Sequence, residues 1–226
     1  MESKRRFWEV DALRGIAIVM MIAFHLAFDL SYFGGYDIGI HSGLLFYLGR
    51  ATASIFILLA GISLSLSHSR SAAGMERYLI KGLKIFSWGL LITMATILFF
   101  PAEFIVFGIL HFIGLSIVLA YPFLRQKRWN LLLGLSIIII GLSIQGPLIL
   151  FPASFRTFDY FPIFPWFGLF LVGIFLGNSL YPDHTRKFRL PEISTPLSTL
   201  GRHSLLIYLI HQPVLIALLY VLGIVA

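Results

Sequence analysis

The sequence contains no cysteine, and this absence removes several kinds of chemistry at once. A disulfide framework, a thiolate nucleophile and a cysteine-ligated metal or iron–sulfur centre are all excluded. GxGxxG, Walker and HExxH patterns are also missing, so none of these nucleotide-binding or metalloprotease motifs indicates a function. Charge is scarce as well, because only 12% of the 226 residues are charged, against about a quarter in soluble domains. A soluble globular protein is therefore not expected.

Apolar residues are what the sequence has in abundance, at 58% of the chain. Runs long enough to cross about 30 Å of hydrocarbon recur from one end to the other. We therefore predict an all-α, polytopic transmembrane helix bundle of about seven spans that forms one domain over residues 1–226. The expected helices are 10–33, 43–67, 76–98, 105–124, 128–148, 162–181 and 202–224. The stretch from Lys187 to Leu200, which holds two prolines, is predicted to be a flexible connector.

The formal net charge is +7, and the basic residues gather in alternate loops between the predicted spans. By the positive-inside rule, this asymmetry predicts a cytoplasmic amino terminus, an outer carboxyl terminus and a multi-pass protein of the plasma membrane. Because the same distribution accounts for the basic balance, no nucleic-acid partner is expected. The lipid bilayer is the expected surrounding, and a homo-oligomer is compatible with the sequence.

Arg14 and His25 stand eleven residues apart within one apolar stretch, from Asp11 to Tyr32. On a helix, eleven residues make about three turns, so both side chains share one face and lie roughly 16 Å apart along the axis. Asp11 and Asp29 fall on the same stripe. A charged stripe on a membrane-length helix is costly in lipid, and it typically marks a substrate path or a reaction site.

His25 is the strongest candidate for the reactive group, as a general base or an acyl acceptor. Asp29, one turn further on, would fix the tautomer of its ring. Arg14, with Asp11 beside it, would bind a phosphate through a forked pair of hydrogen bonds. The stripe therefore suits a long ligand with a charged head and a reactive tail, such as acyl-coenzyme A, and no metal is expected. The plainer alternatives are a surface His–Asp pair and an arginine that snorkels to the interface.

Three other basic side chains are expected to meet His25 in the outer half of the bilayer. Arg50, His111 and His211 each enter from a different predicted helix. Buried charges are least costly where they pair or line a wet cavity, so convergence is the favoured arrangement. Arg50 would help to bind the donor, and the two histidines would line the substrate pocket.

Tyr208, His211 and Gln212 form a polar face of the last predicted helix that is expected to join this pocket. Hydrogen bonding between helices is an equally good explanation of the same face. Trp166 is expected in the substrate pocket, and its segment of prolines and aromatics indicates an interfacial aromatic anchor or, as the alternative, a short re-entrant turn. Glycines at 108, 114, 168, 173 and 177 are expected to mark close helix packing rather than a phosphate-binding loop.

These segments resemble the heparan-alpha-glucosaminide N-acetyltransferase-like family, within the wider transmembrane acyltransferase superfamily. The likeness rests on DALRGIA from Asp11, YFGG from Tyr32, GILH from Gly108, DYFPIFPW from Asp159 and GRHSLLIYLIHQP from Gly201. The resemblance implies transfer of an acyl group, typically acetyl from acetyl-CoA, across the membrane to an acceptor on the far side. The family pattern Arg-x10-His maps onto Arg14 and His25.

The chain looks like a small prokaryotic member, without the large luminal domain of the lysosomal enzymes. We therefore expect a membrane-embedded acyltransferase that takes acetyl-CoA as donor and an amino sugar, another glycan or a small molecule as acceptor. The alternative is a transport or binding protein that moves protons or ions along the same His/Asp/Arg stripe. A small haem protein is a third, weaker hypothesis.

Overall fold

The computed structural model describes residues 6–40, 42–70, 74–143, 156–188, 191 and 195–225. Its α-helices are α1 (Trp8–Tyr32), α2 (Gly43–Arg70), α3 (Met75–Phe99), α4 (Ile109–Leu119), α5 (Lys127–Ser143), α6 (Ile163–Leu180), α7 (Pro196–Arg202) and α8 (Ser204–Val221). The 3₁₀ turns η1 (Tyr121–Phe123) and η2 (Pro182–His184) follow α4 and α6. Within the described residues no strand forms, and the one β contact is an isolated bridge between Phe107 and Tyr160. The predicted all-α class is confirmed.

Five helices are long and apolar enough to cross a membrane, namely α1, α2, α3, α6 and α8. The 25 residues of α1 extend about 37 Å, which exceeds the roughly 30 Å of a hydrocarbon core. Large apolar side chains such as Leu98, Phe99 and Val221 remain exposed on α3 and α8, as a lipid-facing surface requires. The fold is that of a helical membrane bundle. The span count of seven and the direction of the termini stay predictions.

The predicted helix 105–124 is wrong at both ends, because α4 covers only Ile109–Leu119. Side chains of α3 capture the backbone before it: the Thr93 hydroxyl donates to the Ile105 carbonyl, and the Ile105 N–H donates to the Thr96 hydroxyl. Residue 105 therefore has no backbone groups left for a helical turn. The predicted helix 128–148 corresponds to α5, and residues 144–148 lie outside the described part.

The predicted helix 202–224 and the flexible connector before it are also corrected. The connector contains α7, which begins at a Thr195 N-cap that exchanges hydrogen bonds with Ser198, with Pro196 favouring the first helical position. The helix stops at His203, whose Nδ1 lies 3.0 Å from the Thr199 carbonyl, while its backbone N–H bonds to Leu200 one residue too early for an α-helix. The last span is therefore α8 alone, ended by Gly223 at positive φ.

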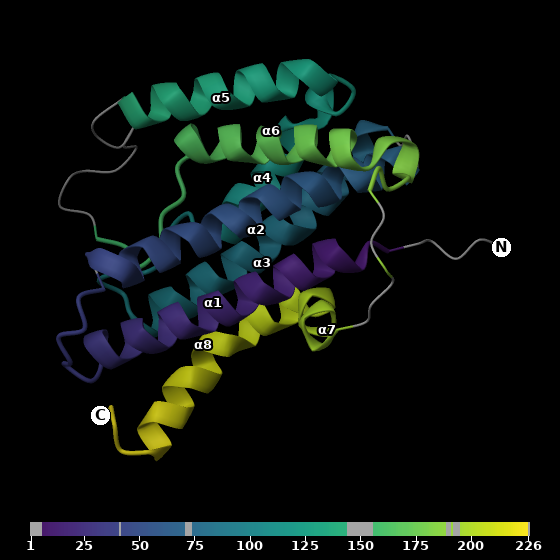
Figure 1. Cartoon of the computed structure of the whole chain (residues 1–226). Helices are drawn as coiled ribbons and strands as arrows, with labels where there is room; N and C mark the ends of the chain where they lie inside the picture. The colour runs from purple at the N-terminus through teal and green to yellow at the C-terminus, as the bar shows by residue number, and fades with distance from the viewer. Residues whose placement is uncertain are drawn as a thin grey trace. The chain divides into compact units, whose positions relative to one another are not determined.

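The structure divides into two compact units. Unit 1 is Met1–Phe56 with Leu190–Ala226, and unit 2 is Ile57–Arg189, so the boundary falls within α2. In unit 1, α7 packs closely on the first turns of α1, because a Cβ at Gly201 or Gly15 would clash with the carbonyl oxygen of Asp11 or Leu197 respectively. Figure 1 shows α8 running beside α1 and then turning away, and Pro213 lies within this helix. Unit 1 is thus organised around α1.

Unit 2 is held together by glycines that let helix backbones touch. Gly82 of α3 and Gly114 of α4 face each other, and a Cβ on either would lie 2.6–2.7 Å from the carbonyl oxygen of the other. Gly134 of α5 and Gly168 of α6 form the same kind of contact, at 2.5–2.7 Å. Small residues at such interfaces allow the close backbone approach that stabilises helices in membranes. The packing role predicted for Gly114 and Gly168 is confirmed.

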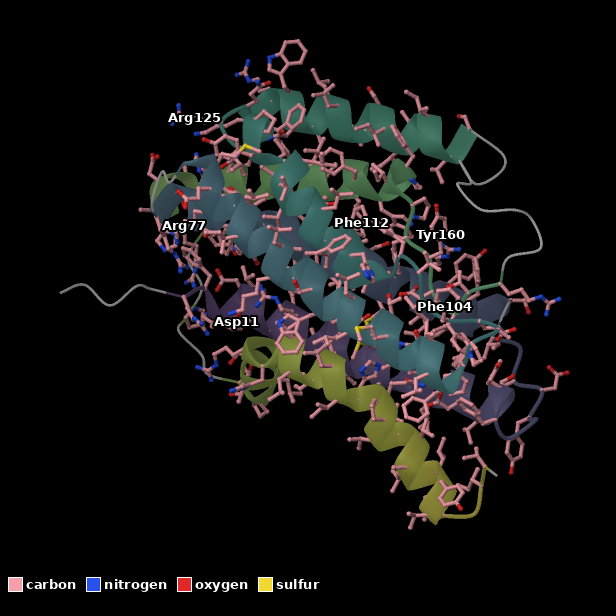
Figure 2. The ribbon with its side chains drawn as sticks, turned by 180° about the vertical axis from the view of Figure 1, so that it is seen from behind. Asp11, Arg77, Phe104, Phe112, Arg125 and Tyr160 are labelled. Atoms are coloured by element: carbon pink, nitrogen blue, oxygen red, sulfur yellow. The ribbon has the colours of Figure 1, made fainter. Side chains whose placement is uncertain are left out.

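Basic residues mark one end of unit 2. Figure 2 places Arg77 and Arg125 at one end, with Phe104 and Tyr160 at the opposite end and Phe112 between them. At the basic end, Arg70 on the last turn of α2 donates from Nε to His184 Nε2 at 3.0 Å. These residues follow the charge asymmetry that the positive-inside rule uses, whereas Arg156 precedes Thr157, which bonds to Phe104 at the opposite end.

Candidate functional site

The predicted stripe lies on a single unbroken helix, α1. At its beginning, Arg14 donates from its guanidinium to Asp11 Oδ1 at 2.8 Å, three residues earlier. The backbone of Asp11 is also where Gly201 of α7 makes its closest approach. His25 follows eleven residues after Arg14, on the same face and about 16 Å along the axis. The structure therefore confirms that one continuous helix carries both residues, and their roles stay predictions.

The structure shows no hydrogen bond between the described residues Asp29 and His25, so the orienting role predicted for Asp29 gains no support. Its Oδ1 atom instead accepts a hydrogen bond from Gln212 Nε2 of α8, and the carboxyl group is fully buried. The identity of the donor is clear because a carboxylate can only accept, so the amide nitrogen must face it. The i, i+4 spacing had suggested a local pair, whereas burial turned the carboxyl toward a neighbouring helix. Asp29 and Gln212 therefore join α1 to α8.

His25 meets a second imidazole rather than a carboxylate. The ring centroids of His25 and His211 lie 4.8 Å apart, with 56° between the ring planes. The Nδ1 atom of His211 lies 2.7 Å from the backbone carbonyl of Tyr208. A carbonyl only accepts, so Nδ1 carries the proton and the neutral ring has its lone pair on Nε2. The structure thus brings together the predicted reactive residue and a predicted pocket residue.

Buried acceptor atoms without a hydrogen-bond partner gather in this α1–α8 region. Three such atoms of the described residues lie here, namely Asp29 Oδ2, Gln212 Oε1 and His211 Nε2, whereas Asn130 Oδ1 lies in unit 2. Leaving such an atom unpaired costs about 1–3 kcal/mol, and native structures contain few of them. The residues Asp29, His25, His211 and Gln212 are called the α1–α8 polar cluster below. This cluster is the candidate functional site.

The beginning of α2 approaches α1 next to this cluster. A Cβ at Gly49 would lie 2.8 Å from the ring of Phe24, which itself makes an edge contact with His25 at 5.5 Å between centroids. The next residue, Arg50, is exposed, and its guanidinium carbon lies 5.3 Å from the centroid of the Phe46 ring. Such a cation–π contact helps to hold the charge. The proposed donor-binding role of Arg50 stays a prediction.

His111 belongs to unit 2, where it packs as a satisfied core histidine. Its Nδ1 accepts the Gly108 N–H at 3.2 Å, and its Nε2 lies 3.5 Å from the Thr93 hydroxyl. The ring makes an edge contact with Phe86 and stacks on Phe107. It is 1% exposed. Both ring nitrogens therefore have partners inside the unit, and the expected substrate-pocket role gains no support from these contacts.

Trp166 is buried in unit 2, at 8% exposure, with its ring 5.1 Å from that of Phe161. Packing inside the unit disfavours the interfacial anchor that the sequence suggested. The sequence pattern does not single out another tryptophan, Trp8. Its indole N–H, at the start of α1, is buried without a hydrogen-bond partner in the described part of the chain. Its place one turn before Asp11 is the signal that could have drawn attention to it.

The comparisons with known proteins are consistent with this geometry. The family model described as "Heparan-alpha-glucosaminide N-acetyltransferase, catalytic" matches residues 6–213. This range contains Arg14 and His25 and ends just after Gln212, so it includes every residue of the α1–α8 polar cluster. No curated protein and no solved structure matches the chain significantly.

Proposed function

The chain belongs to the heparan-alpha-glucosaminide N-acetyltransferase catalytic family, and from this premise we propose that it transfers an acetyl group from cytoplasmic acetyl-CoA to an acceptor on the outer side of the membrane. The observation that carries the proposal is the position of His25. This residue completes the Arg-x10-His pattern, lies within the matched range and faces a second imidazole among buried, unpaired acceptor atoms.

Arg14 and Asp11 are assigned to the donor end of the site. A guanidinium binds phosphate groups, which acetyl-CoA carries at one end of a long flexible arm. The roughly 16 Å between Arg14 and His25 would be spanned by that arm, with the thioester at the histidine. Arg50 and Tyr208 are candidates to donate hydrogen bonds to the thioester oxygen as negative charge develops on it.

The reaction moves one acetyl group and one proton. The nitrogen or oxygen nucleophile of the acceptor forms a bond to the acetyl carbonyl carbon, the carbon–sulfur bond breaks, and the proton of the nucleophile ends on the departing CoA thiolate. His25 acts at this centre either as the base that carries the proton or as a transient acyl acceptor. The two routes differ in one observable, because only the second leaves a labelled acetyl group on the protein.

Topology gives the proposal its direction. With seven spans and a cytoplasmic amino terminus, Arg14 lies toward the cytoplasm and His25 toward the outer face. An amino sugar, another glycan or a small molecule would then approach from outside. The family membership favours transfer over proton or ion transport, although the same stripe would suit either.

The test is a transfer assay with the full chain reconstituted in liposomes. Acetyl-CoA labelled in the acetyl group is supplied on one side and glucosamine on the other, and labelled product and free CoA are measured together. We expect stoichiometric product and CoA, with turnover lost in His25→Ala and kept in His203→Ala, whose ring is exposed. Normal turnover by folded His25→Ala would contradict the assigned role. Thermal stabilisation by acetyl-CoA reports donor binding independently of turnover.

A further inference from the structure

His211 carries a lone pair that the surrounding protein leaves unused. Its Nδ1–H is held by the Tyr208 carbonyl at 2.7 Å, which fixes the tautomer and places the lone pair on Nε2. That atom is buried without a partner among the described residues, in a side chain that is 8% exposed. A backbone carbonyl that orients one nitrogen while the other stays available is the arrangement that an imidazole base needs.

The position of this ring is fixed relative to His25 by two contacts from successive residues of α8. His211 faces His25 at 4.8 Å between centroids. Gln212, the next residue, donates to the buried carboxyl of Asp29, one turn after His25 on α1. We call this Gln212–Asp29 hydrogen bond the α1–α8 latch. Because both contacts join the same two helices, the latch restricts how far the two imidazoles can move apart.

The two rings are not equally prepared to act as a base. No hydrogen bond within the described residues fixes the tautomer of His25, because the carboxyl group expected to do so is engaged by Gln212. His211 has its tautomer fixed by the backbone. A base whose acceptor nitrogen is already oriented has less to reorganise when it takes up a proton.

We infer that His211 is a catalytic base of the acetyl transfer, acting beside His25; this inference rests on the proposed function. His211 Nε2 accepts the proton of the acceptor N–H or O–H while that atom forms its bond to the acetyl carbonyl carbon. The carbon–sulfur bond then breaks, and His211 returns the same proton to the CoA thiolate. His211 is thereby restored to its neutral form. In this route His211 takes the base role that His25 was given above, and His25 contacts the thioester instead.

The variant that isolates this role is His211→Asn. Asparagine can still donate a hydrogen bond to the Tyr208 carbonyl, but it has no imidazole lone pair. The control is His203→Asn, eight residues earlier at the start of α8, because its Nδ1 also lies beside a backbone carbonyl, at 3.0 Å from Thr199, while the ring is exposed. Each protein is reconstituted and assayed with acetyl-CoA and glucosamine for kcat and KM. Melting temperature is measured with and without acetyl-CoA.

In a preparation whose wild type transfers acetyl, His211→Asn should lose about 10²–10⁴-fold in kcat. The KM for acetyl-CoA and the acetyl-CoA-dependent rise in Tm should stay near the wild-type values, and His203→Asn should keep wild-type kcat. A raised KM for acetyl-CoA with unchanged kcat would show that His211 only binds substrate, and it would overturn the inference. Unchanged kinetics, or a lowered Tm with normal activity of the folded fraction, would also overturn it.

If His211→Asn does not fold, His211→Gln takes its place with the same criteria. Loss of folding in both variants would make His211 a packing residue and contradict the inference. Absence of transfer to glucosamine, to other glycans and to small-molecule acceptors, by a wild type that acetyl-CoA does stabilise, would end the proposed function, and the assignment of His211 with it. The wild-type arm therefore separates failure of the proposed function from failure of the His211 assignment.

Discussion

Two buried histidines, one in each unit, show how differently the same side chain can be used. In unit 2, His111 Nδ1 accepts a hydrogen bond from the Gly108 N–H, and His111 Nε2 is paired with the Thr93 hydroxyl. His211 in unit 1 gives Nδ1–H to the Tyr208 carbonyl, and its Nε2 is buried without a partner in the described residues. The two rings therefore adopt opposite neutral tautomers. Both nitrogens of His111 are hydrogen-bonded within unit 2, whereas Nε2 of His211 keeps a lone pair that is available to a ligand.

The surroundings of the two rings extend the contrast. His111 lies flat over Gly89 between two phenylalanines, so its contacts are those of a packed core. His211 faces another imidazole and stands next to the α1–α8 latch, where further acceptor atoms lack donors. Burial alone does not distinguish a structural from a functional histidine. What distinguishes them is whether each ring nitrogen has a hydrogen-bond partner in the protein.

The largest expected difference between the two histidines is in how much each contributes to the stability of the protein. His111→Ala removes two hydrogen bonds and the ring contacts of a packed site, so we expect a loss of about 3 kcal/mol. His211→Ala removes a single protein hydrogen bond and should lose clearly less. Melting temperatures of the two variants in the same detergent, without acetyl-CoA, measure the difference. An equal or greater loss for His211→Ala would show that both rings are packing residues.

The next prediction tests whether Arg14, in the same unit as His211, binds the phosphates of the donor. Arg14→Gln should raise the KM for acetyl-CoA about thirtyfold, equivalent to about 2 kcal/mol, because a charge-assisted contact to phosphate is lost. Acetyl-pantetheine, which lacks the phosphates, should be used equally well by the variant and the wild type. Steady-state kinetics with both donors decide the matter. The phosphate role fails if the variant discriminates against acetyl-pantetheine as strongly as against acetyl-CoA.

The α1–α8 latch can be tested by exchanging its acid and amide side chains between positions 29 and 212. Gln212→Leu should lower kcat about tenfold, because the imidazoles lose a contact that holds their helices in register. The double variant Asp29→Asn with Gln212→Glu can restore a hydrogen bond of opposite polarity and should recover most of that loss. Recovery of kcat is the readout, with Tm measured in parallel. If the kcat of the double variant is no higher than that of Gln212→Leu, the α1–α8 latch does not contribute to catalysis.

The smallest effect concerns α7, which packs on the first turns of α1. Thr195→Ala removes the side chain that accepts from the Ser198 N–H at 3.1 Å, and such N-caps are worth about 1 kcal/mol. We expect a small fall in Tm, with Thr195→Ser close to wild type because serine is also a good cap. Thermal unfolding of the three proteins measures it. A fall of equal size in Thr195→Ser would point to lost methyl packing instead.

Local features of the sequence were sufficient for most of the fold. The apolar runs identify α1, α2, α3, α6 and α8, because length and hydropathy decide whether a segment can cross a bilayer. The Arg14–His25 geometry follows equally, since spacing along one helix fixes a shared face. Helix ends were harder. The chain before Ile109 and at His203 leaves the helical path because side chains capture backbone groups, and such local competition is invisible to hydropathy.

Contacts between distant segments account for what the sequence could not predict in the site. Asp29 and Gln212 are 183 residues apart, so the spacing of Asp29 to His25 offered a nearer partner instead. The tautomer of His211 depends on a backbone carbonyl one turn earlier, which every helical residue supplies in principle. Only the packed arrangement shows which ring nitrogen remains available. Sequence patterns therefore identified the participants of the α1–α8 polar cluster but not their pairing.

A double-mutant cycle on His25 and His211 tests the central claim most directly. The kcat of acetyl transfer from acetyl-CoA to glucosamine is measured for wild type, His25→Asn, His211→Asn and the double variant. If the two imidazoles act in one step, either single variant should lose about as much as the double, because residues that work as a unit are not additive. Losses that simply multiply, or a single variant with wild-type turnover, would contradict the account.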